Sequence, residues 1–209
     1  MAAKIKKTRP ELLKQRRSLA AYERFLPTLV LKKQQIQMEI LKVRSEAARV
    51  RHELDRQIKS IDSWLPLFSE SLPGPITRLV QVTGIELGAR NVAGIALPTL
   101  QAVHFAQKPY SLFATPPWVD KGLAFVKELL QLREAFRVLL EQERLLQKEL
   151  RKVTQRVNLF EKVMIPRTKE NIRIIRIQLA EEETAAVGRA KIAKGKSEGK
   201  GRSAQEASA

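Results

Sequence analysis

The chain has 209 residues, a length that fits one globular domain or one elongated domain. It has no cysteine, which excludes disulfides and thiolate metal sites, and only 5% of its residues are aromatic. A formal net charge of +17 suits a polyanionic partner, whether nucleic acid, a membrane surface or an acidic protein cavity. No apolar run approaches the ~20 residues that cross a bilayer. The basic N-terminus lacks the apolar segment of a secretory signal, so we expect a soluble intracellular protein.

Residues 9–68 are predicted to form the first helix of a coiled coil. They contain no glycine, and apolar side chains recur every seven residues in two rows, which is the pattern of a coiled-coil seam. The first row is Leu12, Leu19, Leu26, Lys33, Ile40, Ala47, Leu54 and Ile61. The second row is Tyr22, Leu29, Ile36, Val43, Val50, Gln57 and Trp64.

Residues 69–116 differ in character, because prolines and glycines gather there. The segments LVQVTGIEL and VAGIALPTLQAVHF, separated by GARN at 88–91, predict two strands around a turn. Pro98 lies in the second segment, so we expect that strand to be an edge strand or an interrupted one. This middle region is therefore predicted to be a small β-hairpin with irregular flanks.

Residues 117–187 are predicted to form the second coiled-coil helix, with Thr115 as its N-cap. One heptad row contains Leu129, Phe136, Glu143, Leu150, Val157 and Met164, and the other contains Leu132, Leu139, Leu146, Val153, Phe160, Arg167 and Ile174. The stretch NIRIIRIQL also alternates as a strand would, but its helical flanks favour a helix. Residues 188–209 are predicted to be a flexible basic tail, because glycine, serine and lysine dominate them.

The two helical segments fit one another as an antiparallel pair. Residues facing each other across such a pair have numbers with a constant sum, and the sums 186, 193 and 200 all bring row onto row. Pro27 and Pro166 add to 193 and favour that register. Each proline is expected to interrupt its helix. Two facing prolines would let both helices bend together, although each could also simply mark a helix break.

The fold class that follows is mostly α: a long antiparallel two-helix coiled coil with a small central β-hairpin. The predicted seam consists of Leu19, Leu29, Ile36, Ile40, Val43, Leu54, Ile61, Leu132, Leu139, Leu146, Leu150, Val153, Val157 and Met164, and the predicted matched kinks are Pro27 and Pro166. Four polar residues interrupt the heptad rows: Lys33, Gln57, Glu143 and Arg167. They are candidates for partner contacts, or they simply reach solvent and set the register.

Two distant stretches carry a family resemblance. The run TRPELLKQRRSLAAYERFLPTLVLKKQQIQMEI near the N-terminus and the run RKVTQRVNLFEKVMIPRTKENIRIIRIQL resemble the D subunits of the V/A-type ATPases, as do NVAGIALP and TPPWVD between them. The resemblance covers about residues 4–187.

The resemblance implies a central-stalk rotor subunit. Such a protein transmits torque between the catalytic ring of A and B subunits and the membrane rotor connector, and it carries the stalk F subunit on its side. A cytoplasmic location, peripheral on the cytoplasmic face of the membrane, is implied as well. No cofactor and no direct nucleic-acid partner are expected from it.

We expect no catalytic site, because convergent chemical groups are scarce in this sequence. His52 and His104 are the only histidines, and nothing near them has metal-ligand spacing. Gly195, Lys196 and Ser197 match the end of a phosphate-binding loop, but the first glycine of that motif would fall at Ala190. The alternative function is that of a basic coiled-coil protein binding nucleic acid, although aromatic stacking platforms are missing.

Overall fold

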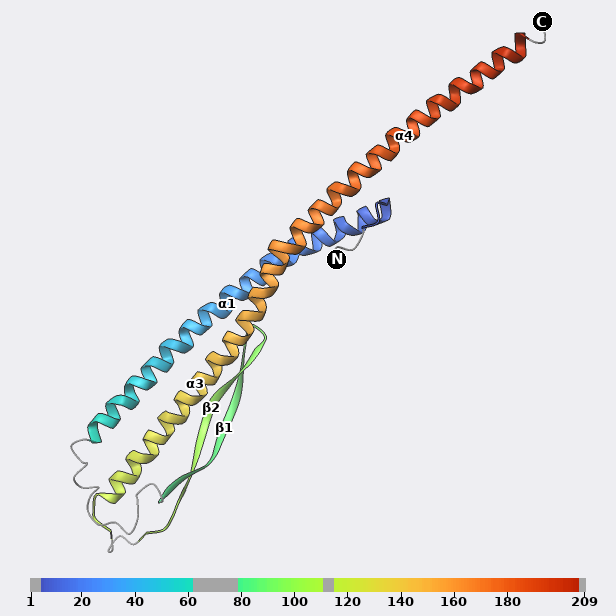
Figure 1. Ribbon diagram of the computed structural model, residues 1–209. Helices are drawn as coiled ribbons and strands as arrows, with labels where there is room; N and C mark the ends of the chain where they lie inside the picture. The colour runs from blue at the N-terminus through green and yellow to red at the C-terminus, as the bar shows by residue number, and fades with distance from the viewer. Residues whose placement is uncertain (1–4, 62–78, 111–114, 207–209) are drawn as a thin grey trace. The chain divides into compact units, whose positions relative to one another are not determined.

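The computed structural model describes residues 5–61, 79–110 and 115–206, with side chains described to residue 196 (Figure 1). Its elements in chain order are helix α1 (Arg9–Ile61), strands β1 (Val80–Val92) and β2 (Ile95–Gln107), helix α3 (Val119–Leu159), the π-helical turn η2 (Phe160–Met164) and helix α4 (Ile165–Glu206). The predicted fold class is confirmed: two long helical segments enclose one β-hairpin in the sequence. Residues 62–68 of the first predicted helix, including Trp64, lie outside the described residues.

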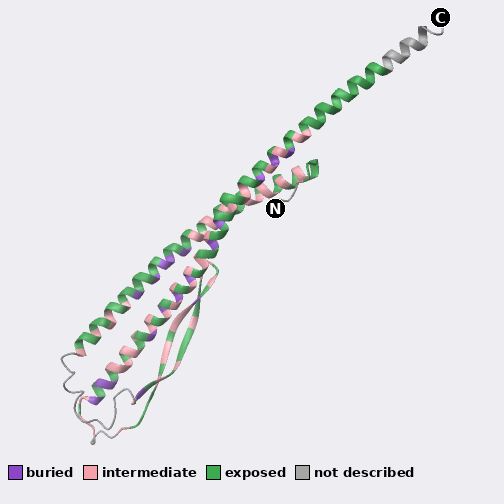
Figure 2. Ribbon diagram, in the orientation of Figure 1, coloured by how far each residue is buried: buried purple, intermediate pink, exposed green. Residues whose placement is uncertain are grey.

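The chain divides into two compact units, and each long helical segment contributes to both. Unit 1 contains residues 1–30 and 155–209, so it pairs the start of α1 with the end of α3, η2 and α4. Unit 2 contains residues 31–154, so it pairs the rest of α1 with most of α3 and adds the hairpin. Within each unit the helices run antiparallel, and Figure 2 shows buried residues recurring along α1, along α3 and in the first part of α4.

The hairpin turns at a different place from the predicted one. Residues 88–91 belong to β1, and the turn is formed by Ala93 and Gly94, whose φ angles are 52° and 79°. Positive φ at both central residues matches the right-handed twist of the flanking strands, and glycine adopts it without steric cost. Gly88 instead meets a packing need, since a Cβ there would lie 2.6 Å from the Gln101 amide nitrogen.

The second strand accommodates Pro98 without interruption. Both strands of a two-stranded sheet are edges, so a missing N–H can face away from the ladder, and Pro98 pairs with Ala89. Two register irregularities, between Val82 and Gly84 and between Glu86 and Leu87, shift the pairing along the hairpin. Strand β2 continues past Pro98 to Gln107.

Helix α3 begins at Val119, later than the predicted cap at Thr115. The Val119 N–H donates to the Pro116 carbonyl oxygen at 3.1 Å, so the two prolines form the turn before the helix instead of its first turn. Val119 and Leu123 are buried together with Val80, and Phe105, Trp118 and Leu130 pack around them. This cluster fixes the start of α3 against the base of the hairpin.

The basic tail is helical to Glu206, where the sequence predicted a flexible segment. Alanine, lysine, glutamate and arginine all have high helix propensity, and in this segment they outweigh isolated glycines such as Gly188 and Gly195. Residues 180–196 are exposed throughout. Propensity, and not packing, therefore sustains this part of α4.

Both prolines lie inside helices that continue through them. Pro27 lies within α1, and Pro166 is the second residue of α4. Directly before Pro166 the helix widens into η2, where the Ile165 N–H donates to the carbonyl oxygen of Phe160, five residues earlier. A π turn of this kind adds one residue to the helix while the backbone stays helical.

Candidate functional site

The residues predicted for the seam are all at least partly buried. Ile36, Ile40, Val43, Leu139, Leu146, Val153 and Val157 are buried, and the other seven, Leu19, Leu29, Leu54, Ile61, Leu132, Leu150 and Met164, are half-buried. Ile36 and Leu146 have no exposed surface at all. Pro27 and Pro166 are both exposed. Half of the residues predicted for the seam are thus buried and half are half-buried, and none of them is exposed.

Beyond η2 the heptad rows are advanced by one residue. The sequence places Arg167 and Ile174 in the seam, but Arg167 is exposed, and its neighbour Thr168 is only 5% exposed. Ile175 has no exposed surface, whereas Ile174 is half-buried. The extra residue of the π turn rotates the following helix by about 100°, which carries the next residue in the chain into the seam. Arg167 is therefore exposed to solvent, which is one of the alternatives expected for it, and Thr168 takes its place in the row.

The register also differs from the predicted sum of 193. In unit 1, Arg9 pairs with Glu183 and Glu23 with Lys169, each with a sum of 192, on one side of the seam. On the other side, Gln15 and Asn171 are hydrogen-bonded with a sum of 186. In unit 2, Arg44 and Glu143 have a sum of 187. The centre of the seam thus lies between the predicted sum and its alternative of 186.

Three of the polar residues in the heptad rows remain at the edge of the seam. Glu143 is half-buried and forms a 2.6 Å ion pair with Arg44 of the facing helix. Lys33 is half-buried, and the side-chain oxygen of Gln57 is buried without a hydrogen-bond partner among the described residues. Of these three residues, Glu143 contacts the facing helix directly, so it helps to set the register of unit 2.

The hairpin is held against the helices by polar contacts that the heptad pattern does not reveal. Glu39, only 8% exposed, accepts a hydrogen bond from Arg90 of β1. Gln142 of α3, 6% exposed, donates to the Pro98 carbonyl oxygen at 2.5 Å. Leu97 is fully buried beside this contact. Glu39 and Gln142 flank the heptad rows. The only sign of either in the sequence is a polar residue next to a row position.

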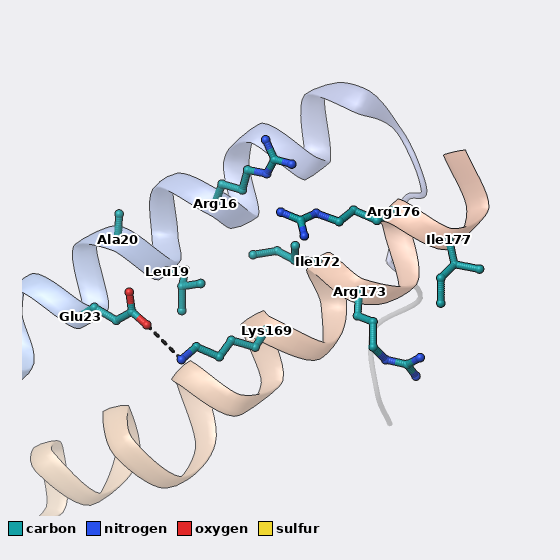
Figure 3. Close-up of a pocket in the computed structure, with 9 residues that line it drawn as sticks. All are labelled: Arg16, Leu19, Ala20, Glu23, Lys169, Ile172, Arg173, Arg176 and Ile177. Carbon is teal, nitrogen blue, oxygen red and sulfur yellow. Dashed lines mark ion pairs between the residues drawn. The ribbon is translucent and has the colours of Figure 1, made fainter. Parts of the chain in front are cut away.

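One open side of the unit 1 helix pair carries a groove with a volume of about 600 Å³. Leu19, Ala20, Ile172 and Ile177 supply its apolar surface, and its charged residues are Arg16, Glu23, Lys169, Arg173 and Arg176 (Figure 3). Glu23 forms an ion pair with Lys169 at 3.1 Å. Arg173 is paired with Glu170 at 2.7 Å, and this hydrogen bond lowers the pKa of the Glu170 carboxyl.

Positive charge is concentrated in unit 1. Its 20 lysines and arginines stand against 9 acidic residues, a balance of +11, whereas unit 2 has 19 against 13, a balance of +6. Together they account for the +17 of the chain. Unit 1 is also the smaller unit, so its field attracts anionic surfaces more strongly.

The described residues hold no cluster of three or more histidine, aspartate or glutamate side chains that suits a metal ion. His52 is exposed on α1, and His104 lies 2.9 Å from Glu86 on the exposed hairpin surface. Within the described part of the chain, no helix is both long and apolar enough to cross a bilayer.

Comparisons with known proteins agree over nearly the whole chain. The family model of the ATP synthase D subunit matches residues 11–195. The chain is 42% identical over 192 residues to the V-type ATP synthase D subunit of Borreliella burgdorferi, covering 92% of this chain and 94% of that protein. It is 33% identical over 197 residues to the V-type ATP synthase D subunit of Chlamydia caviae, covering 94% of this chain and 95% of that protein.

Proposed function

The chain belongs to the family of ATP synthase D subunits and is a component of a rotary ATPase, and from this premise we propose that it is the non-catalytic central shaft that transmits torque. Unit 1, which holds both terminal helical segments, would lie inside the ring of A and B subunits. The stalk F subunit would attach to its side, and the hairpin end would contact the membrane rotor connector. The shaft would act at the cytoplasmic face of the membrane.

The observation that carries this proposal is the apolar seam present in both units. A single helix bends and twists easily, whereas two helices locked by interdigitating side chains resist both deformations. In unit 2, Ile36, Val43 and Leu146 are almost fully buried. In unit 1, Ile172 and Ile175 are buried. Helix pairs stiffened in this way can carry a rotational load.

The hairpin contributes a third contact surface in unit 2. The Glu39–Arg90 and Gln142–Pro98 contacts fasten it to both helices, so twisting one helix against the other would strain it. The matched-kink hypothesis extends the proposal to unit 1, where Pro27 and Pro166 would allow a coordinated bend. It rests on the presence of both prolines inside continuous helices.

Reconstitution tests the proposal. The purified chain is mixed with the A, B and F subunits, and the complexes are separated by size and weighed by native mass spectrometry. We expect one copy of the chain per ring and one F subunit per chain. Rotation of a bead attached to the hairpin end, driven by ATP, would demonstrate torque. Failure to join the ring, combined with steeply salt-dependent binding to random DNA, would favour the nucleic-acid alternative instead.

A further inference from the structure

Charged side chains form a regular ladder along the side of unit 1 that carries the groove. The ladder consists of Arg9, Arg16 and Glu23 on α1, facing Glu183, Arg176 and Lys169 on α4. Successive rungs are one heptad apart on both helices, and each rung has a residue sum of 192. The two outer rungs are ion pairs, Arg9–Glu183 at 2.8 Å and Glu23–Lys169 at 3.1 Å.

The middle rung breaks this pattern, because it places two arginines opposite each other. Arg16 and Arg176 line the same groove, and Figure 3 shows their guanidinium groups pointing toward one another above Ile172. Neither arginine forms an ion pair with any residue in the described part of the chain. Two guanidinium groups held side by side repel each other unless an anion lies between them.

The acidic groups around the groove are already engaged. Glu23 is paired with Lys169 on the adjacent rung, and Glu170 is paired with Arg173. The floor below the two arginines is apolar, since Ile172 is 7% exposed and Leu19 is half-buried. An anion that enters is partly shielded from water on that side, which strengthens its attraction to both cations. The described acidic residues around the groove therefore leave the middle rung without a negative charge.

We infer that Arg16 and Arg176 bind a carboxylate side chain, an aspartate or glutamate, on the protein surface that encloses this part of the shaft. The inference rests on the proposed function, which places unit 1 inside the ring. Guanidinium groups match the planar, two-oxygen geometry of a carboxylate, and they remain charged at all physiological pH values. The groove is open along the helix pair, so a carboxylate held by a large partner surface loses less freedom there than a small free anion does.

The test substitution is Arg176→Glu, because it should act in opposite directions on two measurements. In the isolated chain it completes the ladder, since the new carboxylate at position 176 faces Arg16, so the thermal unfolding midpoint should rise by about 1–3 °C. In the reconstituted complex it puts a negative charge where the partner carboxylate binds. Affinity for the A/B ring should then fall by about tenfold or more.

The matched control is Arg17→Glu, which changes the net charge by the same amount. Arg17 follows Arg16 on α1 but does not line the groove. Both measurements are compared with this control, so general effects of lower net charge cancel. A ring affinity equal for the two variants would overturn the inference, as would a midpoint lower for Arg176→Glu than for the control. If the unmodified chain does not bind the ring, the shaft proposal fails as well. Stabilisation of the unmodified chain by inorganic phosphate, with ring binding equal in both variants, would assign the site to a free anion.

Discussion

Two adjacent isoleucines allow a direct test of the phase change at the π turn. The uninterrupted heptad places Ile174 in the seam, whereas the structure buries Ile175 completely and leaves Ile174 half-buried. We predict that Ile175→Ala destabilises the protein far more than Ile174→Ala does. Both substitutions replace the same residue type in the same turn, so the gain in helix propensity from alanine cancels in the comparison.

The magnitude follows from burial. Truncating a fully buried isoleucine to alanine lowers the free energy of unfolding by about 2–5 kcal/mol. This loss combines the burial energy of the removed methyl and methylene groups with the cost of the cavity left behind. A half-buried side chain loses less apolar contact area, and its site can relax toward solvent, so about 1 kcal/mol is expected for Ile174. The difference between the two variants should therefore be about 1–4 kcal/mol, with Ile175→Ala the less stable.

Urea unfolding followed by circular dichroism in the far ultraviolet measures both variants against the unmodified chain. Because the chain forms two units, the curves are fitted with two transitions wherever these separate, and the loss is assigned to unit 1. Equal losses, or a larger loss for Ile174→Ala, would show that the heptad runs through without a phase change and would refute the reasoning.

Three further predictions follow from other contacts. In a double-mutant cycle, Glu39→Gln and Arg90→Gln should show a coupling of about 1 kcal/mol in unfolding free energy, and additive losses would mean that the pair does not hold the hairpin. The Tyr110 hydroxyl donates to Asp120, which raises the pKa of Tyr110 above 10.0; the contact favours folding below pH 10 and loses its effect as the pH rises through the raised value. In a Tyr22→Phe background, absorbance titration should show that Asp120→Asn lowers the pKa of Tyr110. An unchanged titration curve would contradict the assigned Tyr110–Asp120 hydrogen bond. Truncation after Gly188 should move the melting temperature by no more than about 1 °C, because the described side chains beyond it are exposed, and a large fall would show an unseen packing role.

The sequence was sufficient for the parts of the fold that depend on hydrophobic periodicity. Rows of apolar residues every seven positions identified both long helices and, up to Met164, side chains that are buried or half-buried, because burial of an apolar stripe dominates the stability of such helices. The hairpin was also recognisable, but its turn was placed at residues 88–91. The backbone required by a two-residue turn selects Ala93 and Gly94, and that requirement competes with the stronger composition signal of GARN.

The polar contacts were beyond the reach of sequence reasoning. Glu39 and Gln142 resemble ordinary surface residues of their helices, and only docking of the hairpin buries them. Likewise, the Arg16–Arg176 rung depends on the register of two segments 160 residues apart. A shift of that register by a few residues would place each arginine opposite another residue. Periodicity fixes which face of a helix is buried, but it leaves the register open by whole heptads.

The π turn before Pro166 determines which residues of α4 lie in the charged ladder. Pro166 has no N–H to donate to the carbonyl four residues earlier, so an ordinary α-helix would lose a hydrogen bond and clash at that point. The π turn precedes the proline, and its added residue advances every later side chain by one position. Without that advance, the ladder positions opposite Arg9, Arg16 and Glu23 would be occupied by Glu182, Ile175 and Thr168. The middle rung would then present an isoleucine to Arg16, with no pair of arginines to attract a carboxylate. The local adjustment to one proline thus determines which residues of α4 face a partner.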